Sequence, residues 1–285
     1  MKQVLMAVIL MAMTLGAQAA TRYHWTGAVG TKDMMMPGNW ADDDGNTMTD
    51  PPGADSILVF SEETKALTMS AKQEFEGFWA QANGRFELDK AVVLGKSGVR
   101  HDGTGVCLFG NALTLCKGTN LFVVAKSTGD VQVKNTLTVV AYSHPIIVKE
   151  GPGTLTTIGA TGSEFQAPDE VVLRDGTWLF RAADAKLKTA KTMLTFDGDC
   201  GNAQLKRAKI SSETAVTLPL AGISEAASVS GTTHCITDDG NAFTLTFSGA
   251  DVKKDSYFSG MLCSKMSFLW NPSDALRTFT FAKAT

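Results

Sequence analysis

The chain has 285 residues, 26 Lys and Arg against 29 Asp and Glu, and a formal net charge of −3 at pH 7. This weakly acidic balance argues against a nucleic-acid-binding protein, because affinity for phosphate backbones depends mainly on clustered Lys and Arg. The length allows one long β domain or two smaller domains with a large core.

The N-terminus has the order of a secretory signal peptide. Lys2 precedes an apolar run from Val4 to Met13, and the small-residue triplet Ala17-Gln18-Ala19 follows. We expect residues 1–19 to be removed, so that the mature chain begins at Ala20. The apolar run is too short for a membrane-spanning helix, which needs about 20 residues. The sequence therefore predicts a protein that is exported to the periplasm, the cell surface or the medium and does not span the membrane.

The mature chain repeats one local pattern from Ser56 onward, in which short runs of Val, Leu, Ile, Thr and Phe are bracketed by Gly, Asn and Asp. This pattern predicts strands joined by tight turns. The best helical candidate, residues 182–191, is heavily charged and lacks a continuous apolar face. The chain is therefore predicted to be all-β, with strands at 57–60, 91–94, 112–116, 121–125, 136–142, 146–149, 171–173, 177–180, 193–196, 243–247 and 277–281.

Similar strand units recur at irregular intervals. Residues 110–115, Gly-Asn-Ala-Leu-Thr-Leu, closely match residues 240–245, Gly-Asn-Ala-Phe-Thr-Leu. Short strands that each leave an apolar face uncovered are stabilised when successive turns of chain stack, as in a solenoid. The pattern favours a β-solenoid, with a β-sandwich as the alternative.

The mature chain keeps an odd number of cysteines, so at least one has no partner within the chain. They lie in apolar, strand-like stretches and show no C-x-x-C spacing. We interpret them as mostly buried thiols rather than a disulfide framework. They are Cys107, Cys116, Cys200, Cys235 and Cys263.

Two segments resemble a known family. Tyr23-His24-Trp25-Thr26-Gly27, then Gly38-Asn39-Trp40, then residues 52–60 resemble the opening of secreted proteins with autotransporter-associated β-strand repeats. Residues 149–156, Lys-Glu-Gly-Pro-Gly-Thr-Leu-Thr, resemble the repeat itself. The resemblance implies a right-handed parallel β-helix, here expected without the translocator barrel. We expect an N-terminal cap and first coil over residues 20–62 and the β-solenoid over residues 63–285.

The opening motif supplies aromatic residues that could stack on a sugar. A solenoid, however, needs its terminal coil covered, because an open end exposes core and unpaired strand edges. We therefore predict that Trp25, Trp40 and Phe60 form a structural cap, and that Asp55 is a turn residue that accepts backbone N–H bonds before the strand at 57–60.

An acidic segment offers oxygen ligands of the kind that calcium prefers. Asp42, Asp44, Asn46 and Asp50 lie close in the chain, but their spacing does not complete an EF-hand loop. We expect a solvated turn, with a calcium site as the alternative, and we assign no other cofactor or metal.

The predicted function is non-catalytic. The resemblance implies an extended surface for adhesion or glycan binding by an exported β-helix, with a glycan or an envelope protein as the partner. The first alternative is a polysaccharide lyase or another carbohydrate-active enzyme, because some parallel β-helices cleave glycans. Arg174 and Asp175 are the residues that we would test for that role, although no segment supplies a convincing acid/base pair. The second alternative is a structural protein of the cell envelope.

Overall fold

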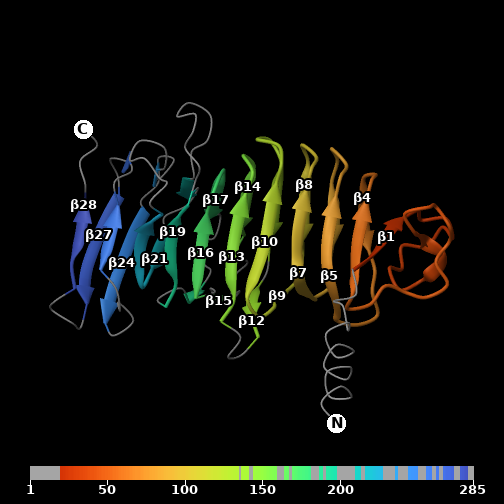
Figure 1. Ribbon diagram of the computed structural model, residues 1–285, viewed down its shortest axis with the longest axis horizontal. Helices are drawn as coiled ribbons and strands as arrows, with labels where there is room; N and C mark the ends of the chain where they lie inside the picture. Colours follow the sequence, from red (N-terminus) through yellow and green to blue (C-terminus); the bar gives the residue numbers. More distant parts are fainter. Residues whose placement is uncertain are drawn as a thin grey trace, which may run out of the picture.

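The computed structural model describes residues 20–134, 136–140, 144–158, 164–166, 169–180, 186–188, 191–197, 209–212, 216–226, 235–236, 243–249, 255–258, 261–262, 266–272 and 277–281. The predicted signal peptide, residues 1–19, lies outside these ranges. The described part is an elongated stack of parallel strands, a β-solenoid (Figure 1). The prediction of an all-β solenoid is confirmed.

Three series of strands form the sides of the solenoid, with one strand of each series in a typical coil. The first series runs from β1 to β28. Its last two strands, β25 and β28, pair with each other, and β25 lies beside β22. Its strands are β1 (Thr21–Trp25), β3 (Ser56–Phe60), β5 (Gln73–Ala80), β7 (Val92–His101), β10 (Thr119–Val124), β13 (Ile146–Glu150), β16 (Glu170–Leu173), β19 (Met193–Phe196), β22 (Gly222–Glu225), β25 (Ser256–Phe258) and β28 (Phe279–Phe281).

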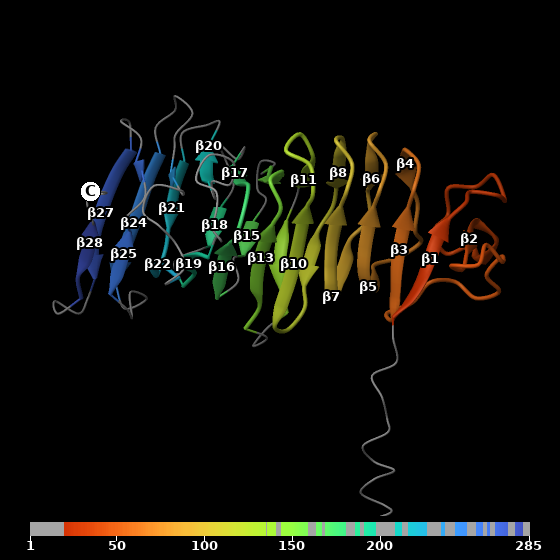
Figure 2. The ribbon, with the colours of Figure 1, turned by 45° about the horizontal axis from the view of Figure 1, so that its top comes forward.

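The second series follows the first in each coil from β3 onward, and the third series completes the coils from β7 onward (Figure 2). The second contains β4 (Thr64–Leu67), β6 (Phe86–Leu88), β8 (Val106–Phe109), β11 (Asp130–Val133), β14 (Thr154–Thr157), β17 (Thr177–Phe180), β20 (Lys209–Ser212), β23 (Cys235–Ile236) and β26 (Met261–Leu262). The third contains β9 (Leu113–Leu115), β12 (Leu137–Val139), β15 (Glu164–Gln166), β18 (Lys186–Lys188), β21 (Val216–Pro219), β24 (Phe243–Gly249) and β27 (Met266–Pro272). Strand β18 lies inside residues 182–191, the best helical candidate in the sequence, so residues 186–188 of that segment agree with the all-β prediction.

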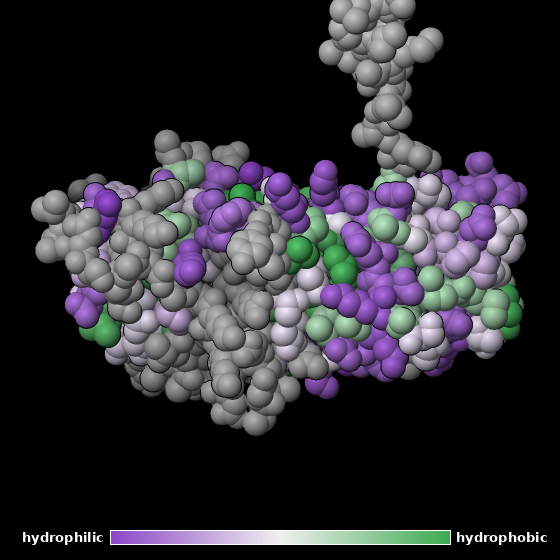
Figure 3. All heavy atoms as spheres, turned by 90° about the horizontal axis from the view of Figure 1, so that it is seen from below, coloured by the Kyte–Doolittle hydropathy of each residue, from purple (hydrophilic) through white to green (hydrophobic). Residues whose placement is uncertain are grey.

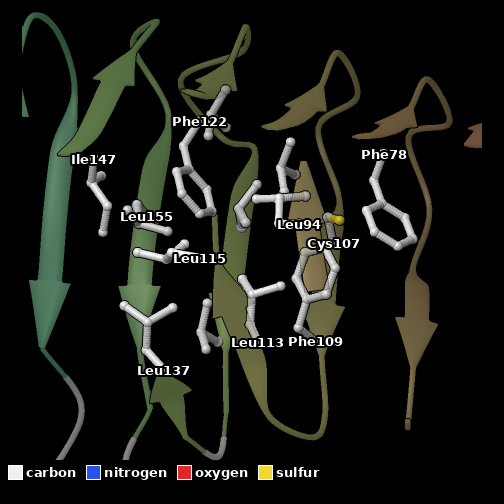
Figure 4. Packing of buried hydrophobic residues seen from close by; sticks show 14 of the residues in the cluster. Phe78, Leu94, Cys107, Phe109, Leu113, Leu115, Phe122, Leu137, Ile147 and Leu155 are labelled. Carbon is white, nitrogen blue, oxygen red and sulfur yellow. The ribbon is translucent and has the colours of Figure 1, made fainter. Parts of the chain in front are cut away.

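The strand register places apolar residues of successive coils next to one another. Leu58 pairs with Phe78 and Val148 with Val172, so one coil takes about 20 to 24 residues at these levels. Because side chains alternate along a strand, register also fixes which residues point inward. The inward residues form one buried cluster that runs through the stack (Figure 4). Burial of these apolar side chains is the main stabilising contribution to the fold.

The N-terminal end is covered by an irregular segment. Strand β1 pairs in parallel with β3, so residues 20–62 continue the sheet of the solenoid. Between them, the chain forms the 3-10 turn η1 (Pro37–Asn39) and the short strand β2 (Trp40–Ala41), which pairs antiparallel with β1. Figures 1 and 2 show these orange loops at one end of the stack.

Candidate functional site

The four residues assigned to the cap do not share one environment. Trp40 and Phe60 are fully buried, with 0% and 1% of their surface exposed, whereas Trp25 is only partly buried. The Trp40 ring lies edge-on to Trp25, at 5.0 Å between ring centroids, and to Phe60, at 5.6 Å. Trp40 Nε1 also donates a hydrogen bond to the carbonyl of Met34, at 2.8 Å. Trp40 and Phe60 therefore have no face available to a ligand.

The turn before β3 differs in detail from the expectation for Asp55. The main-chain carbonyl of Asp55 accepts the N–H of Thr21, at 3.1 Å. The side-chain acceptor in this turn is Ser56, whose Oγ accepts the N–H of Gly53 at 2.9 Å. Asp55 thus marks the turn, while the hydroxyl of the next residue makes the local capping bond.

Asn39 is a key residue that sequence reasoning missed. It is fully buried, and its Oδ1 accepts the N–H of Val29. Its Nδ2 donates to the carbonyl and hydroxyl of Thr31 and to the carbonyl of Asp33, at 3.0 to 3.2 Å. A buried amide with this many partners fixes the conformation of the loop around it. The only sequence feature that could have pointed to Asn39 is its position in the triplet Gly38-Asn39-Trp40.

The acidic segment forms a self-contained turn. The Oδ1 of Asp42 accepts the backbone N–H groups of Asp44 and Asn46, and its Oδ2 accepts the Asn46 side-chain amide. These hydrogen bonds lower the pKa of Asp42, and the two from Asn46 contribute most. Asp44 and Asp50 are exposed. Among the described residues, no group of three or more His, Cys, Asp or Glu side chains is placed to hold a metal ion.

Arg174 and Asp175 do not form an acid/base pair. Arg174 donates to Glu150 at 2.6 Å and to Asp197 at 3.1 Å, and these carboxylates raise its pKa. Asp175 instead accepts the N–H of Gly176 through its Oδ1, at 2.8 Å. A guanidinium held between two carboxylates is a poor base, because its protonated form is stabilised.

Lys149 is a further group that the sequence did not reveal. Its side chain is fully buried, and its Nζ donates to the carbonyls of Glu150, Gly151 and Asp175 at 2.9, 2.6 and 3.1 Å. Burial lowers the pKa of Lys149 to about 7, although the carboxylates of Asp175 and Glu150 act in the opposite direction. This lysine binds the turns of two successive coils together from inside.

Trp79 lies at the surface in a cluster of charges. The guanidinium groups of Arg22 and Arg100 lie 5.5 and 5.1 Å from its ring centroid. Its Nε1 donates to Asp102 at 2.7 Å, and Asp102 also accepts from Arg100. In contrast, Trp178 is a core residue, with 1% of its surface exposed. Figure 3 shows purple hydrophilic residues between smaller green areas over the described N-terminal half of the face seen from below.

A groove with chemically varied side chains lies on the outer surface of β13, β16, β19 and β22. Its volume is about 610 Å³. The strands are in register here, because Glu170 pairs with Met193 and Thr195 pairs with Ser224. The side chains therefore come from successive coils. The lining residues, called the groove below, are His144, Ile146, Asp169, Glu170, Lys191, Met193, Thr195, Ala221, Ser224 and Asp255.

Hydrogen bonds order the polar side chains of the groove. His144 Nδ1 lies 2.6 Å from Asp169 Oδ2. The hydroxyl of Thr195 donates to Glu170 at 2.5 Å and lies 2.9 Å from the Ser224 hydroxyl. The lining carries three carboxylates against one lysine and one histidine, so its charge is negative at neutral pH. Tyr257, on β25 and two residues after Asp255 in the chain, is 44% exposed but does not line the groove.

Two of the cysteines fit the sequence interpretation. Cys107 is a fully buried free thiol whose pKa is raised by burial, and Cys116 is a half-buried free thiol. Cys200 and Cys263 lie outside the described residues, as does the side chain of Cys235. Buried thiols of this kind pack as small apolar groups and react slowly.

The described ranges contain no apolar helix of the length that a membrane crossing requires. Comparison with known proteins found no matching family model, no similar curated protein and no similar solved structure. The resemblance to proteins with autotransporter-associated repeats therefore stays a prediction from the sequence motifs.

Proposed function

We propose that this protein is an exported, non-catalytic β-solenoid that binds an extended neutral glycan in the groove. The observation that carries the proposal is the register of the groove strands, which aligns donors and acceptors from successive coils on one outer face. Adjacent parallel strands lie about 4.8 Å apart. A linear polymer along the solenoid axis would therefore meet a new set of polar side chains at each coil.

The side chains of the groove suit hydroxyl-rich ligands. The carboxylates of Asp169, Glu170 and Asp255 are acceptors for hydroxyl groups, while Lys191 is a donor. Hydrogen bonds to charged groups are stronger than those between neutral groups. Beyond the lining itself, the exposed ring of Tyr257, two residues after Asp255 in the chain, is an aromatic face of the kind that suits the C–H face of a sugar.

Charge selects the kind of glycan. The negative lining repels polyuronates and other polyanions at neutral pH, because like charges across a binding surface oppose association. A neutral polysaccharide avoids this cost. The groove is also open, with the His144 side chain 79% exposed and that of Asp169 56% exposed. An open, polar surface favours recognition over chemistry that requires exclusion of water.

Titration calorimetry with xylan, mannan and a soluble β-glucan, and with polygalacturonate as the polyanion, tests this function. At least one neutral polymer should bind and polygalacturonate should not. Glu170→Gln and Asp255→Asn should each weaken binding about tenfold or more, because a hydrogen bond to a charged group contributes about 1.5 to 3 kcal/mol. The matched control is Glu87→Gln, since Glu87 lies on β6 and pairs with Arg85 there. Equal affinity in the groove and control variants, or binding of polygalacturonate alone, contradicts the proposal.

A second candidate function is glycan cleavage. One observation favours it: His144 has a φ of 46°, which is uncommon for a residue other than glycine, and its ring is oriented by Asp169. A histidine oriented by a carboxylate is a frequent general base. Incubation with the same polymers should then release new reducing ends, and His144→Gln should stop the release while binding persists. Binding without turnover excludes this candidate for the polymers tested.

A further inference from the structure

A second hollow lies at the N-terminal end, beside the aromatic cluster. Its volume is about 710 Å³, and two segments form its walls. Residues 25–27 and 30–32 supply one wall, and residues 61–64 supply the other. The side chains that matter below are Trp25, Thr31, Lys32 and Glu62. The two wall segments belong to the red and orange N-terminal end of the ribbon in Figures 1 and 2.

The indole of Trp25 packs against the buried aromatic rings of the N-terminal cluster. It meets the buried Trp40 edge-on and lies tilted by 34° against Phe60, at 6.2 Å between centroids. Gly27 has a φ of 60°, and a Cβ at Gly27 would lie 3.4 Å from Trp25 Nε1. Glycine therefore suits this turn beside the indole because it adopts the positive φ without strain. The ring packs against two buried aromatic rings, yet it lines the hollow and is only partly buried.

Both walls are also fixed before any ligand arrives. Asn39 holds the first wall through Thr31, whose carbonyl and hydroxyl accept its Nδ2 hydrogen bonds. The second wall is held by Thr64, whose N–H donates to the Arg85 carbonyl at 3.2 Å and whose hydroxyl donates to the Glu62 carbonyl at 3.1 Å. A preorganised site loses less conformational entropy when it binds.

We infer that this hollow is a second carbohydrate site, in which one neutral sugar ring stacks on Trp25. The apolar face of a sugar ring packs on an indole, while the carboxylate of Glu62 and the ammonium of Lys32 supply an acceptor and a donor for its hydroxyls. The carboxylates of Glu62 and Glu63 outnumber the ammonium of Lys32, so the lining disfavours an anionic sugar. The inference does not depend on the groove, whose residues belong to later coils.

The test uses the mature protein labelled with nitrogen-15 at its tryptophan indoles. Methyl pyranosides of glucose, galactose, mannose and N-acetylglucosamine are titrated one at a time, and the indole N–H signals are followed by NMR. Trp25→Phe assigns the Trp25 signal and keeps an aromatic ring against Trp40. At least one pyranoside should shift the Trp25 signal saturably and leave that of the buried Trp178 unchanged.

Variants locate the binding event. Glu62→Gln and Lys32→Ala should each raise the dissociation constant at least threefold, whereas Glu87→Gln should leave it unchanged. The groove variant Glu170→Gln should also leave it unchanged, which separates this site from the groove. Each pyranoside is added to 50-fold molar excess over the protein, at a sugar concentration of ~10 mM, which would populate a weak site with a dissociation constant in that range. The inference is overturned if none of the four shifts the Trp25 signal under these conditions. It is also overturned if Glu170→Gln abolishes the shift, or if both hollow variants bind as the unmodified protein does.

Discussion

The Nζ atom of Lys149 lies 2.6 Å from the carbonyl oxygen of Gly151, inside the solenoid and with no surface exposed. Two further carbonyls, from Glu150 and Asp175, complete its hydrogen bonds. Three N–H groups of an ammonium match three carbonyl acceptors. Because Asp175 belongs to the following coil, this single side chain connects two consecutive turns of the chain.

The buried lysine makes the stability of the fold depend on pH. Its pKa is lowered to about 7 in the folded protein from 10.5 in the unfolded chain. Between these values the unfolded chain binds more protons, so the free energy of unfolding rises with pH, by at most about 1.4 kcal/mol per pH unit. Below pH 7 both states are protonated and the contribution is constant. Urea unfolding of the wild type and of Lys149→Met from pH 6 to 10 should show this rise only in the wild type. Parallel curves for the two proteins would mean that Lys149 keeps its ordinary pKa.

Trp40 should be the residue of the N-terminal cluster on which stability depends most. Trp40→Ala removes a fully buried ring, which typically costs about 3–5 kcal/mol. Trp40→Phe keeps part of the packing but loses the hydrogen bond to Met34, so its cost should be smaller. Denaturant unfolding measures both. A loss below ~1 kcal/mol for Trp40→Ala would show that the cluster does not stabilise this end.

Asn39→Ala should loosen the loop at residues 29–33. The N–H of Val29 and the carbonyl of Asp33 lose a buried partner, which costs about 1–3 kcal/mol. Hydrogen exchange at the Val29 amide should accelerate. Asn46→Ala is the control, because Asn46 is exposed. If Val29 exchanges at the same rate in both variants, Asn39 does not hold this loop.

Gly176 should tolerate alanine less well than Gly45, although both have positive φ values, of 73° and 84°. A Cβ at Gly176 would lie 2.2 Å from the carbonyl oxygen of Gly153, whereas a Cβ at Gly45 would meet no atom within 4 Å. In both variants the alanine must adopt a positive φ, which lowers the free energy of unfolding by about 1–2 kcal/mol. Any further loss of stability in Gly176→Ala therefore comes from the clash of the new Cβ with the neighbouring coil. Melting temperatures compare them, and equal melting would argue against tight stacking at this turn.

Export predicts a defined N-terminus. The apolar run that ends before Ala17-Gln18-Ala19 should direct cleavage after Ala19. Mass spectrometry of the secreted protein should find Ala20 first, or a residue within one or two positions of it. A mature product that retains Met1 contradicts the signal peptide.

The sequence by itself determined the all-β class and many strands. Alternating apolar residues at 193–196, for example, predicted β19, because each second side chain must be covered. Strand β5 escaped prediction, since Gly77 and three polar residues interrupt its apolar pattern. Its inward residues Phe75 and Phe78 are nonetheless fully buried.

Only the tertiary structure decided where the polar groups meet. Thr195 and Ser224 are 29 positions apart in the chain, yet their hydroxyls lie 2.9 Å apart because β19 and β22 pair in register. Local sequence carries no information about that register, which depends on the length of every turn in between. The same holds for Trp25 and Trp40: one motif supplies both, but stacking on the first coil buries Trp40 and leaves part of Trp25 facing the hollow.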